Sequence, residues 1–168
     1  KNELPNVGMA VTIDLGAENN VHPGDKRPVG ERLARWALAE VYQKSEMIST
    51  GPLVLRVDFQ MDGKAKVHFD HTGGTLATVD QQPPRHFEVA GHDGHFRSAI
   101  TRIEGDVVTV ELNDTVPIQQ VRYAWSSFPR PSVNLVNAQG LPVSPFLVPP
   151  AHHSESKQPF FCLQKKAF

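Results

Sequence analysis

The chain has 168 residues, of which 39% are hydrophobic and 21% charged, and its formal net charge is −1. This composition is typical of a folded globular protein, and a net charge so close to zero gives no indication of a nucleic-acid partner or an anionic membrane surface. No apolar run approaches the roughly 20 residues of a membrane-spanning helix. Cys162 is the single cysteine, so the chain forms no internal disulfide and its redox compartment stays open.

The first part of the chain has the pattern of a strand, a loop and a helix. Residues 1–7 are expected to form a loop, and the short β-branched run within residues 9–15 is typical of a strand buried on both faces. A polar loop that contains His22 follows. A helix is then expected over about residues 28–43, with Asp25 or the next residues as its cap and Pro28 in its first turn.

One face of this predicted helix is apolar. The residues at helical spacing are Val29, Leu33, Trp36, Ala37 and Val41. We expect Trp36 to anchor the helix on a sheet rather than to bind a ligand. One strand and one helix cannot bury each other, and the chain begins at Lys1 with no signal peptide. Residues 1–46 are therefore expected to be the C-terminal piece of a larger α/β domain.

After a polar connector at residues 44–51, the hydrophobic period changes to two. Leu53, Leu55, Val57 and Phe59 alternate with more polar residues, and a second alternating run covers residues 65–69. Gly63 lies in the turn between them, where a positive φ is needed, so the two runs are predicted to form an antiparallel hairpin.

Further short strands are predicted downstream. They cover residues 87–90, 98–103, 107–112 and 121–125, and turn residues separate them. The alternation of Tyr123 and Trp125 with polar neighbours predicts that both face the core. Short strands at this spacing predict an antiparallel β-sandwich over residues 47–148, followed by a tail at residues 149–168. The fold class is therefore mixed α and β, and mainly β.

His22 is the candidate general base. It lies in a loop between a predicted buried strand and a helix, where α/β hydrolytic enzymes commonly hold this group. The alternative is a loop histidine that only packs or is solvated. A serine hydrolase also needs a nucleophile on a strained turn, but Ser126 and Ser127 are far from any glycine-rich turn. We therefore assign no nucleophile to this chain.

The stretch at residues 8–26, GMAVTIDLGAENNVHPGDK, resembles the histidine block of the sialate O-acetylesterase family, which are SGNH-type esterases. In that family a strand of this kind leads into an Asp-Ile-His-Pro-type loop and a helix. The resemblance continues in the same order through four later blocks, and it covers about residues 5–148. These blocks are residues 87–91, 121–125, 134–137 and 140–146.

The resemblance implies a function for the parent protein. It would remove O-acetyl groups from sialic acid or another acetylated sugar through a serine and histidine acyl-enzyme mechanism, with His22 as the base. The nucleophile would lie on a missing segment or another chain, so this chain alone is predicted to be inactive. No cofactor and no metal are implied. Family members are mostly secreted, periplasmic or lysosomal.

Asn20 departs from the family pattern, because the position two before the histidine is usually aspartate. An amide oxygen accepts the imidazole N–H but cannot neutralise the imidazolium, and loss of that carboxylate costs roughly 10⁴-fold in rate in serine hydrolases. Three explanations stay open. The acid comes from the missing segment; or Asp14, Glu18 or Asp25 replaces it; or the family aspartate does not orient the base.

Zinc binding and carbohydrate binding are two other functions that the sequence could serve. Zinc could bind near His68, Asp70 and His71, or near His92, Asp93 and His95, but these spacings match no established zinc motif. Trp125, Phe128 and Tyr123 could offer a sugar platform. The rival to the esterase is therefore a non-catalytic carbohydrate-binding or structural β-sandwich module, with residues 9–42 as its docking arm.

Overall fold

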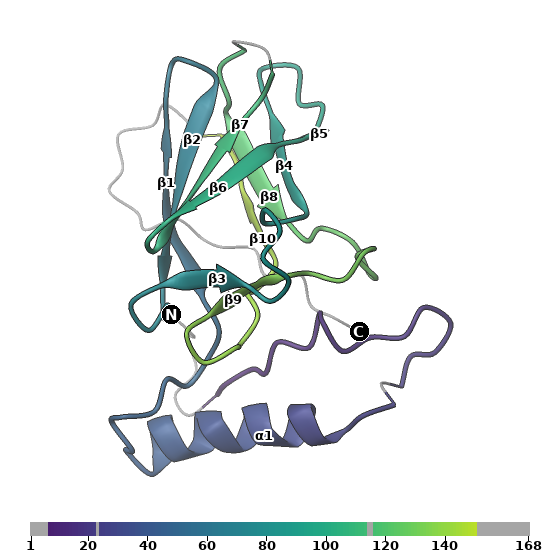
Figure 1. The fold of residues 1–168 in the computed structure, drawn as a ribbon, viewed down its shortest axis with the longest axis vertical. Helices are drawn as coiled ribbons and strands as arrows, with labels where there is room; N and C mark the ends of the chain where they lie inside the picture. The colour runs from purple at the N-terminus through teal and green to yellow at the C-terminus, as the bar shows by residue number, and fades with distance from the viewer. Residues whose placement is uncertain (1–6, 23, 114–115, 151–168) are drawn as a thin grey trace.

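The structure is a computed structural model that describes residues 7–22, 24–113 and 116–150 (Figure 1). Residues 1–6 of the predicted leading loop, and residues 151–168 of the predicted tail with Cys162, lie outside the described residues. The described chain is mainly β, with antiparallel strand pairing and one α-helix, as the sequence predicts. No helix among the described residues is long and apolar enough to cross a membrane.

In the described part of the chain, ten strands form three sheets. The first sheet has the order β1-β2-β7-β6, from strands Leu53–Phe59, Lys64–Asp70, Val107–Glu111 and Ile100–Glu104. The second has the order β10-β8-β4-β5, from strands Phe146–Val148, Gln120–Tyr123, Phe87–Ala90 and Arg97–Ser98. A third pair joins β3 (Leu76–Thr78) to β9 (Leu135–Asn137). The predicted hairpin and the predicted strands at residues 87–90, 107–112 and 121–125 are present. The predicted strand at residues 98–103 is instead divided into β5 and β6, which lie in different sheets, and β3, β9 and β10 are additional.

The two larger sheets contribute to one hydrophobic core. Val67 and Val108 from the first sheet and Val89 and Val121 from the second are all fully buried in it. Tyr123 packs there with a ring centroid distance of 4.8 Å to Phe87. Burial raises the pKa of the Tyr123 phenol, so this group stays neutral in the core. The alternating pattern of the sequence therefore does bury one face of each of these strands.

Strand β1 departs from the predicted alternation at Leu55. The pairing of β1 with β2 shifts between Val54 and Arg56, so Leu55 is an extra residue in the ladder. A bulge of this kind reverses which side chains face the core. Leu55 is accordingly 59% exposed, whereas Val54 packs against the core. The prediction that Leu55 shares the apolar face was wrong for this reason.

The predicted strand at residues 9–15 is not formed. The stretch is irregular, ends in a turn in which the Leu15 N–H donates to the Thr12 carbonyl at 3.0 Å, and leaves Met9 about half exposed. A strand needs a neighbour to complete its hydrogen-bond ladder, and no strand among the described residues pairs with this stretch. Ile13 alone packs against the hydrophobic core.

The predicted helix is present as α1 (Arg27–Trp36), which continues as a π-helical turn over Ala37–Val41. Pro28 lies in its first turn as predicted, and the Asp25 carboxylate accepts the Arg27 N–H at 3.0 Å. No residue of α1 is fully buried. Trp36 packs on Gly8, where an added Cβ would lie 2.0 Å from the indole. Figure 1 shows α1 at the end of the molecule beyond β3 and β9.

Arg32 ties this helix to residues 9–15. Its guanidinium donates to both carboxylate oxygens of Asp14, at 2.7 and 2.6 Å, and to the Val11 carbonyl at 2.6 Å. The two side chains are only 12% and 23% exposed. A bidentate, partly buried pair of this kind is much stronger than a surface ion pair. It supplies part of the hydrogen bonding that a strand partner would otherwise give.

The bulge generates a first prediction. Val67→Ala removes buried atoms from the core and should lower the free energy of unfolding by about 2 kcal/mol. Leu55→Ala, the matched control on the neighbouring strand, should change it by less than about 0.5 kcal/mol because Leu55 faces solvent. Urea unfolding measures both. Similar losses for the two variants would contradict the bulge.

The Arg32 tie generates a second prediction. Arg32→Ala should speed amide hydrogen exchange in α1 and leave the core strands β2 and β7 unchanged, because the tie holds only the helix and residues 9–15. The control is Arg27→Ala, which removes an exposed pair with Glu31 on the same helix and should have little effect. An α1 that exchanges equally fast in both variants would show that Arg32 does not hold the helix.

Candidate active site

His22 lies in an exposed loop between the irregular stretch and α1. Its backbone N–H donates to the Asn20 side-chain oxygen at 2.9 Å, and the Asn20 N–H donates to the Ala17 carbonyl at 3.4 Å. These bonds form two successive tight turns. An Asx-turn of this kind is a common use of asparagine, and it fixes the backbone at His22.

The side chain of Asn20 therefore bonds to the backbone of His22 rather than to its ring. An aspartate at this position could accept the same N–H, since both side chains present a carbonyl-type oxygen. The geometry gives position 20 a role in shaping the loop. The catalytic roles of His22 and Asn20 stay predictions.

The three carboxylates weighed as replacements for the family aspartate each have another partner. Asp14 pairs with Arg32, Glu18 pairs with Arg130, and Asp25 accepts the Arg27 backbone N–H. No carboxylate in the described part of the chain forms an ion pair with His22. Of the three explanations for Asn20, substitution by one of these groups is thus the least supported.

The loop at residues 126–132 packs beside the stretch that precedes His22. Phe128 lies against Gly16, where an added Cβ would be 3.1 Å from the aromatic ring. Arg130 forms an ion pair with Glu18 and lies over the Phe128 ring at 5.2 Å. A side chain at position 16 would displace Phe128, so glycine permits this close approach.

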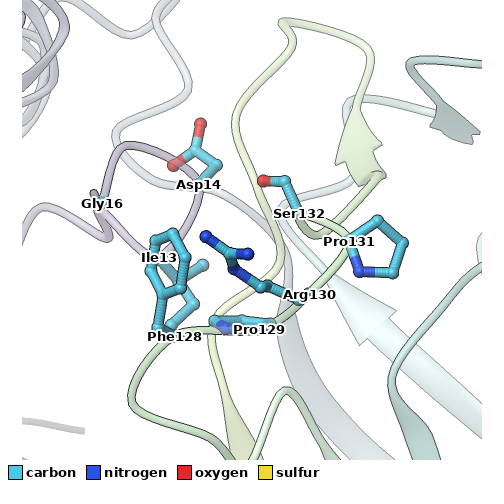
Figure 2. A pocket seen from close by; sticks show the side chains of 8 residues that line it. All are labelled: Ile13, Asp14, Gly16, Phe128, Pro129, Arg130, Pro131 and Ser132. Atoms are coloured by element: carbon cyan, nitrogen blue, oxygen red, sulfur yellow. The ribbon is translucent and has the colours of Figure 1, made fainter. Parts of the chain in front are cut away.

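Two cavities lie along this contact. The first, of about 470 Å³, is bordered by residues 9–13 and 16–21 together with Ser127, Phe128, Ser144 and Pro145. The second, of about 360 Å³, is lined by Ile13 and Asp14 on one side and by residues 128–132 on the other. Figure 2 shows the second cavity, with the Arg130 side chain extending from the loop toward Ile13 and Asp14. Asn20 lines the first cavity, so the His22 loop and the cavity are adjacent.

The serines do not complete a catalytic pair with His22 in the described structure. Ser127 lines the same cavity as Asn20, and Ser126 accepts the Phe128 N–H at 3.4 Å. Neither lies on a strained strand-to-helix turn, because no helix follows them among the described residues up to 150. The expectation that the nucleophile lies on another segment stays a prediction.

The two histidine clusters have ordinary surface partners. His68 lies 2.8 Å from Asp58, and His71 lies 3.6 Å from Asp70. In the other cluster Arg97 and the His95 N–H hold the pKa of Asp93 at about 2. Within the described ranges, no group of three or more His, Cys, Asp and Glu side chains is arranged to hold a metal ion.

Sequence reasoning missed the residues that fix this region. Arg32 is 18 residues from Asp14, and Arg130 is 112 residues from Glu18. Local patterns carry no signal for such pairs.

The chain is similar to known acetylesterases. No family model matches the chain. The chain is 26% identical over 163 residues to a sialate O-acetylesterase of Mus musculus, covering 89% of this chain and 29% of the mouse protein. A crystal structure of a novel carbohydrate acetylesterase from Xanthomonas citri has a TM-score of 0.76 at 38% identity, covering 82% of this chain and 31% of that one.

The chain therefore spans about three tenths of the length of these two relatives. The similarity extends through the His22 loop and the β-sheets, because the alignment with the mouse protein covers nearly the whole chain. The resemblance to the sialate O-acetylesterase family that the sequence blocks indicated is confirmed by these two homologues.

Proposed function

We propose that this chain is the C-terminal part of a carbohydrate esterase that removes O-acetyl groups from sialic acid or another acetylated sugar. The observation that carries the proposal is the position of the His22 loop, beside a cavity of about 470 Å³ and within a chain homologous to two acetylesterases. A cavity of that size is in the range of small-molecule sites. By analogy with such enzymes, the protein would be secreted, periplasmic or lysosomal.

In this proposal residues 1–46 are the end of an SGNH-type α/β domain, and residues 47–148 are a β-sandwich. The exposed apolar side chains of the first segment support the division. Val41 is 53% exposed and Tyr42 is 69% exposed, and Leu33 and Leu38 are exposed beside them. The remainder of the catalytic domain would cover this face and would offer residues 9–15 the strand neighbours that they lack here.

The proposed chemistry is acyl transfer. A serine from the remainder of the domain attacks the acetyl carbonyl while His22 takes its proton, and the sugar hydroxyl leaves with a proton from the imidazolium. His22 then takes a proton from water, which attacks the acetyl-enzyme, and the imidazolium returns that proton to the serine oxygen as acetate leaves. The acid that stabilises the imidazolium would come from the same missing segment, since the three nearby carboxylates have other partners.

The rival function is a non-catalytic carbohydrate-binding or structural module. The similarity to two proteins that are both described as acetylesterases favours the enzyme. A Gly-x-Ser turn in the parent sequence would separate the two functions, since the module needs no nucleophile.

A third prediction concerns the nucleophile. The chain alone should hydrolyse p-nitrophenyl acetate at the background rate, because no serine among the described residues lies on a strained turn beside His22. Mixing it with the remaining part of the parent protein should restore activity if the two parts associate. Burst kinetics from the chain alone, unchanged by His22→Ala, would contradict the assignment.

A fourth prediction concerns the base and its loop. In the full-length protein His22→Ala should lower kcat/KM by about 10³-fold or more. Asn20→Asp should have little effect on kcat, because it keeps the turn and the acid is supplied elsewhere. His22→Gln serves as the matched variant that keeps size and polarity without a titrating ring. If Asn20→Asp raises kcat at constant KM, position 20 itself orients the base. An active His22→Ala enzyme would remove the catalytic assignment.

A further inference from the structure

A larger cavity lies over the second sheet. This outer groove, of about 830 Å³, is bordered by Glu88 and Arg122 from strands β4 and β8, by residues 82–86, and by Trp125 with residues 129–131. The volume falls within the range of about 300 to 1,000 Å³ that small-molecule sites occupy. The proposed esterase chemistry makes no use of it.

Trp125 reaches the groove because the backbone turns just before it. Ala124 has a φ of 47° and His86, opposite it, a φ of 65°, and the Ala124 N–H donates to the His86 carbonyl at 3.0 Å. A left-handed conformation is costly for residues other than glycine, and residues in such strained conformations cluster at functional sites. The turn removes Trp125 from the core-facing alternation that the sequence predicted. Tyr123 is in the core as expected, but Trp125 lines the groove instead.

The floor of the groove is a fixed polar pair. Glu88 and Arg122 are directly opposite in the register of β4 and β8, and their side chains are joined by a hydrogen bond of 2.8 Å. Arg122 is further held by Phe96, whose ring centroid lies 4.0 Å from the guanidinium carbon. The bond between the pair uses one of five guanidinium donors and one of about four carboxylate acceptor sites. Capacity therefore remains for several hydroxyl groups.

The wall of the groove is also fixed. His86 contacts the Pro131 carbonyl through its Nε2 atom at 2.6 Å, and the Thr101 hydroxyl donates to the Pro84 carbonyl at 2.6 Å. These contacts tie residues 82–86 to the loop at residues 126–132 on one side and to β6 on the other. Side chains held in this way need little reordering when a ligand binds.

The charges around the groove select the class of ligand. Arg85 pairs with Asp80 at 2.6 Å, Arg122 pairs with Glu88, and Arg130 pairs with Glu18. Each arginine on the border thus has a carboxylate partner, which opposes the binding of an anion. An indole face beside fixed donors and acceptors suits a ring with apolar C–H faces and hydroxyl edges.

We propose that the outer groove binds a neutral oligosaccharide, with one pyranose ring packed on Trp125 and its hydroxyl groups bonded to Glu88 and Arg122. This binding site goes beyond the proposed esterase and does not depend on it. The loop at residues 126–132 borders both the outer groove and the cavity beside the His22 loop. An oligosaccharide bound in the outer groove would therefore approach the cavity beside the His22 loop.

The test is a titration of the ¹⁵N-labelled 168-residue chain with cellohexaose, xylohexaose and mannohexaose, followed by NMR. At least one should bind with a Kd at or below about 1 mM and shift the Trp125 indole and the Glu88 and Arg122 backbone signals. Trp125→Ala should weaken that binding about tenfold or more. The matched control is Phe128→Ala, an aromatic on the same loop that lines the other cavity, and it should leave the Kd unchanged.

Three outcomes would overturn the proposal. No shift with any of the three hexasaccharides at about ten times that concentration would exclude a neutral-sugar site. Binding of 3′-sialyllactose alone would assign an anion site. Equal losses in Trp125→Ala and Phe128→Ala would move the sugar to the cavity beside His22. If Trp125→Ala does not fold, Trp125→Phe keeps an aromatic face and should weaken binding less than tenfold, while the wild-type indole shift still locates the sugar. These readouts involve no hydrolysis, so they are independent of the esterase test.

Discussion

The guanidinium of Arg32 is the constraint on which the candidate site depends. Residues 9–15 have no strand neighbour in the described structure, so few backbone bonds hold them. Arg32 takes both oxygens of Asp14 and the Val11 carbonyl, at distances between 2.6 and 2.7 Å. It thereby joins α1 to the stretch that leads into the His22 loop. Lysine could not replace it, because a point charge cannot make the two parallel bonds to a carboxylate.

A second contact fixes the other side of the same stretch. Ile13 packs against the shared core, and a Cβ at Gly16 would lie 3.1 Å from the Phe128 ring, which would then have to shift. The Glu18–Arg130 pair adds a link, but both side chains are about half exposed, so it contributes little to stability. Apolar packing therefore holds the stretch on the β-sheets, and the ion pair at most selects its orientation.

The sequence predicted the strands of the core well because burial on one face imposes a period of two. Val108 and Val110 illustrate this, since both are fully buried on β7. The same reasoning failed at residues 9–15. A β-branched run indicates only a preference for extended backbone, and a strand also requires a neighbouring strand to pair with. It failed at Leu55 because one inserted residue changes the phase without any change in composition. Strands of three residues, such as β3, are too short to show a period.

The site was predictable only where its signal is local. His22 could be selected because it follows an apolar run in a recognisable block, and no distant residue was needed. Arg32 and Arg130 could not, because their partners lie far away in the sequence. Trp125 was assigned to the core because its residue type fits the alternation. The left-handed backbone of Ala124 instead directs Trp125 to the groove. Alanine rarely adopts this conformation, so the sequence does not indicate it.

The placement of Trp125 connects the β-sheets with the segment that carries His22. A β-structure that served only as support would gain most by burying its indole, since a buried aromatic side chain contributes strongly to the core. Here the chain accepts two left-handed residues, His86 and Ala124, and the indole lines a groove. The loop that borders this groove is the one that packs on Gly16. The backbone strain at these two residues lies where a ligand on the sheet and the His22 loop would meet.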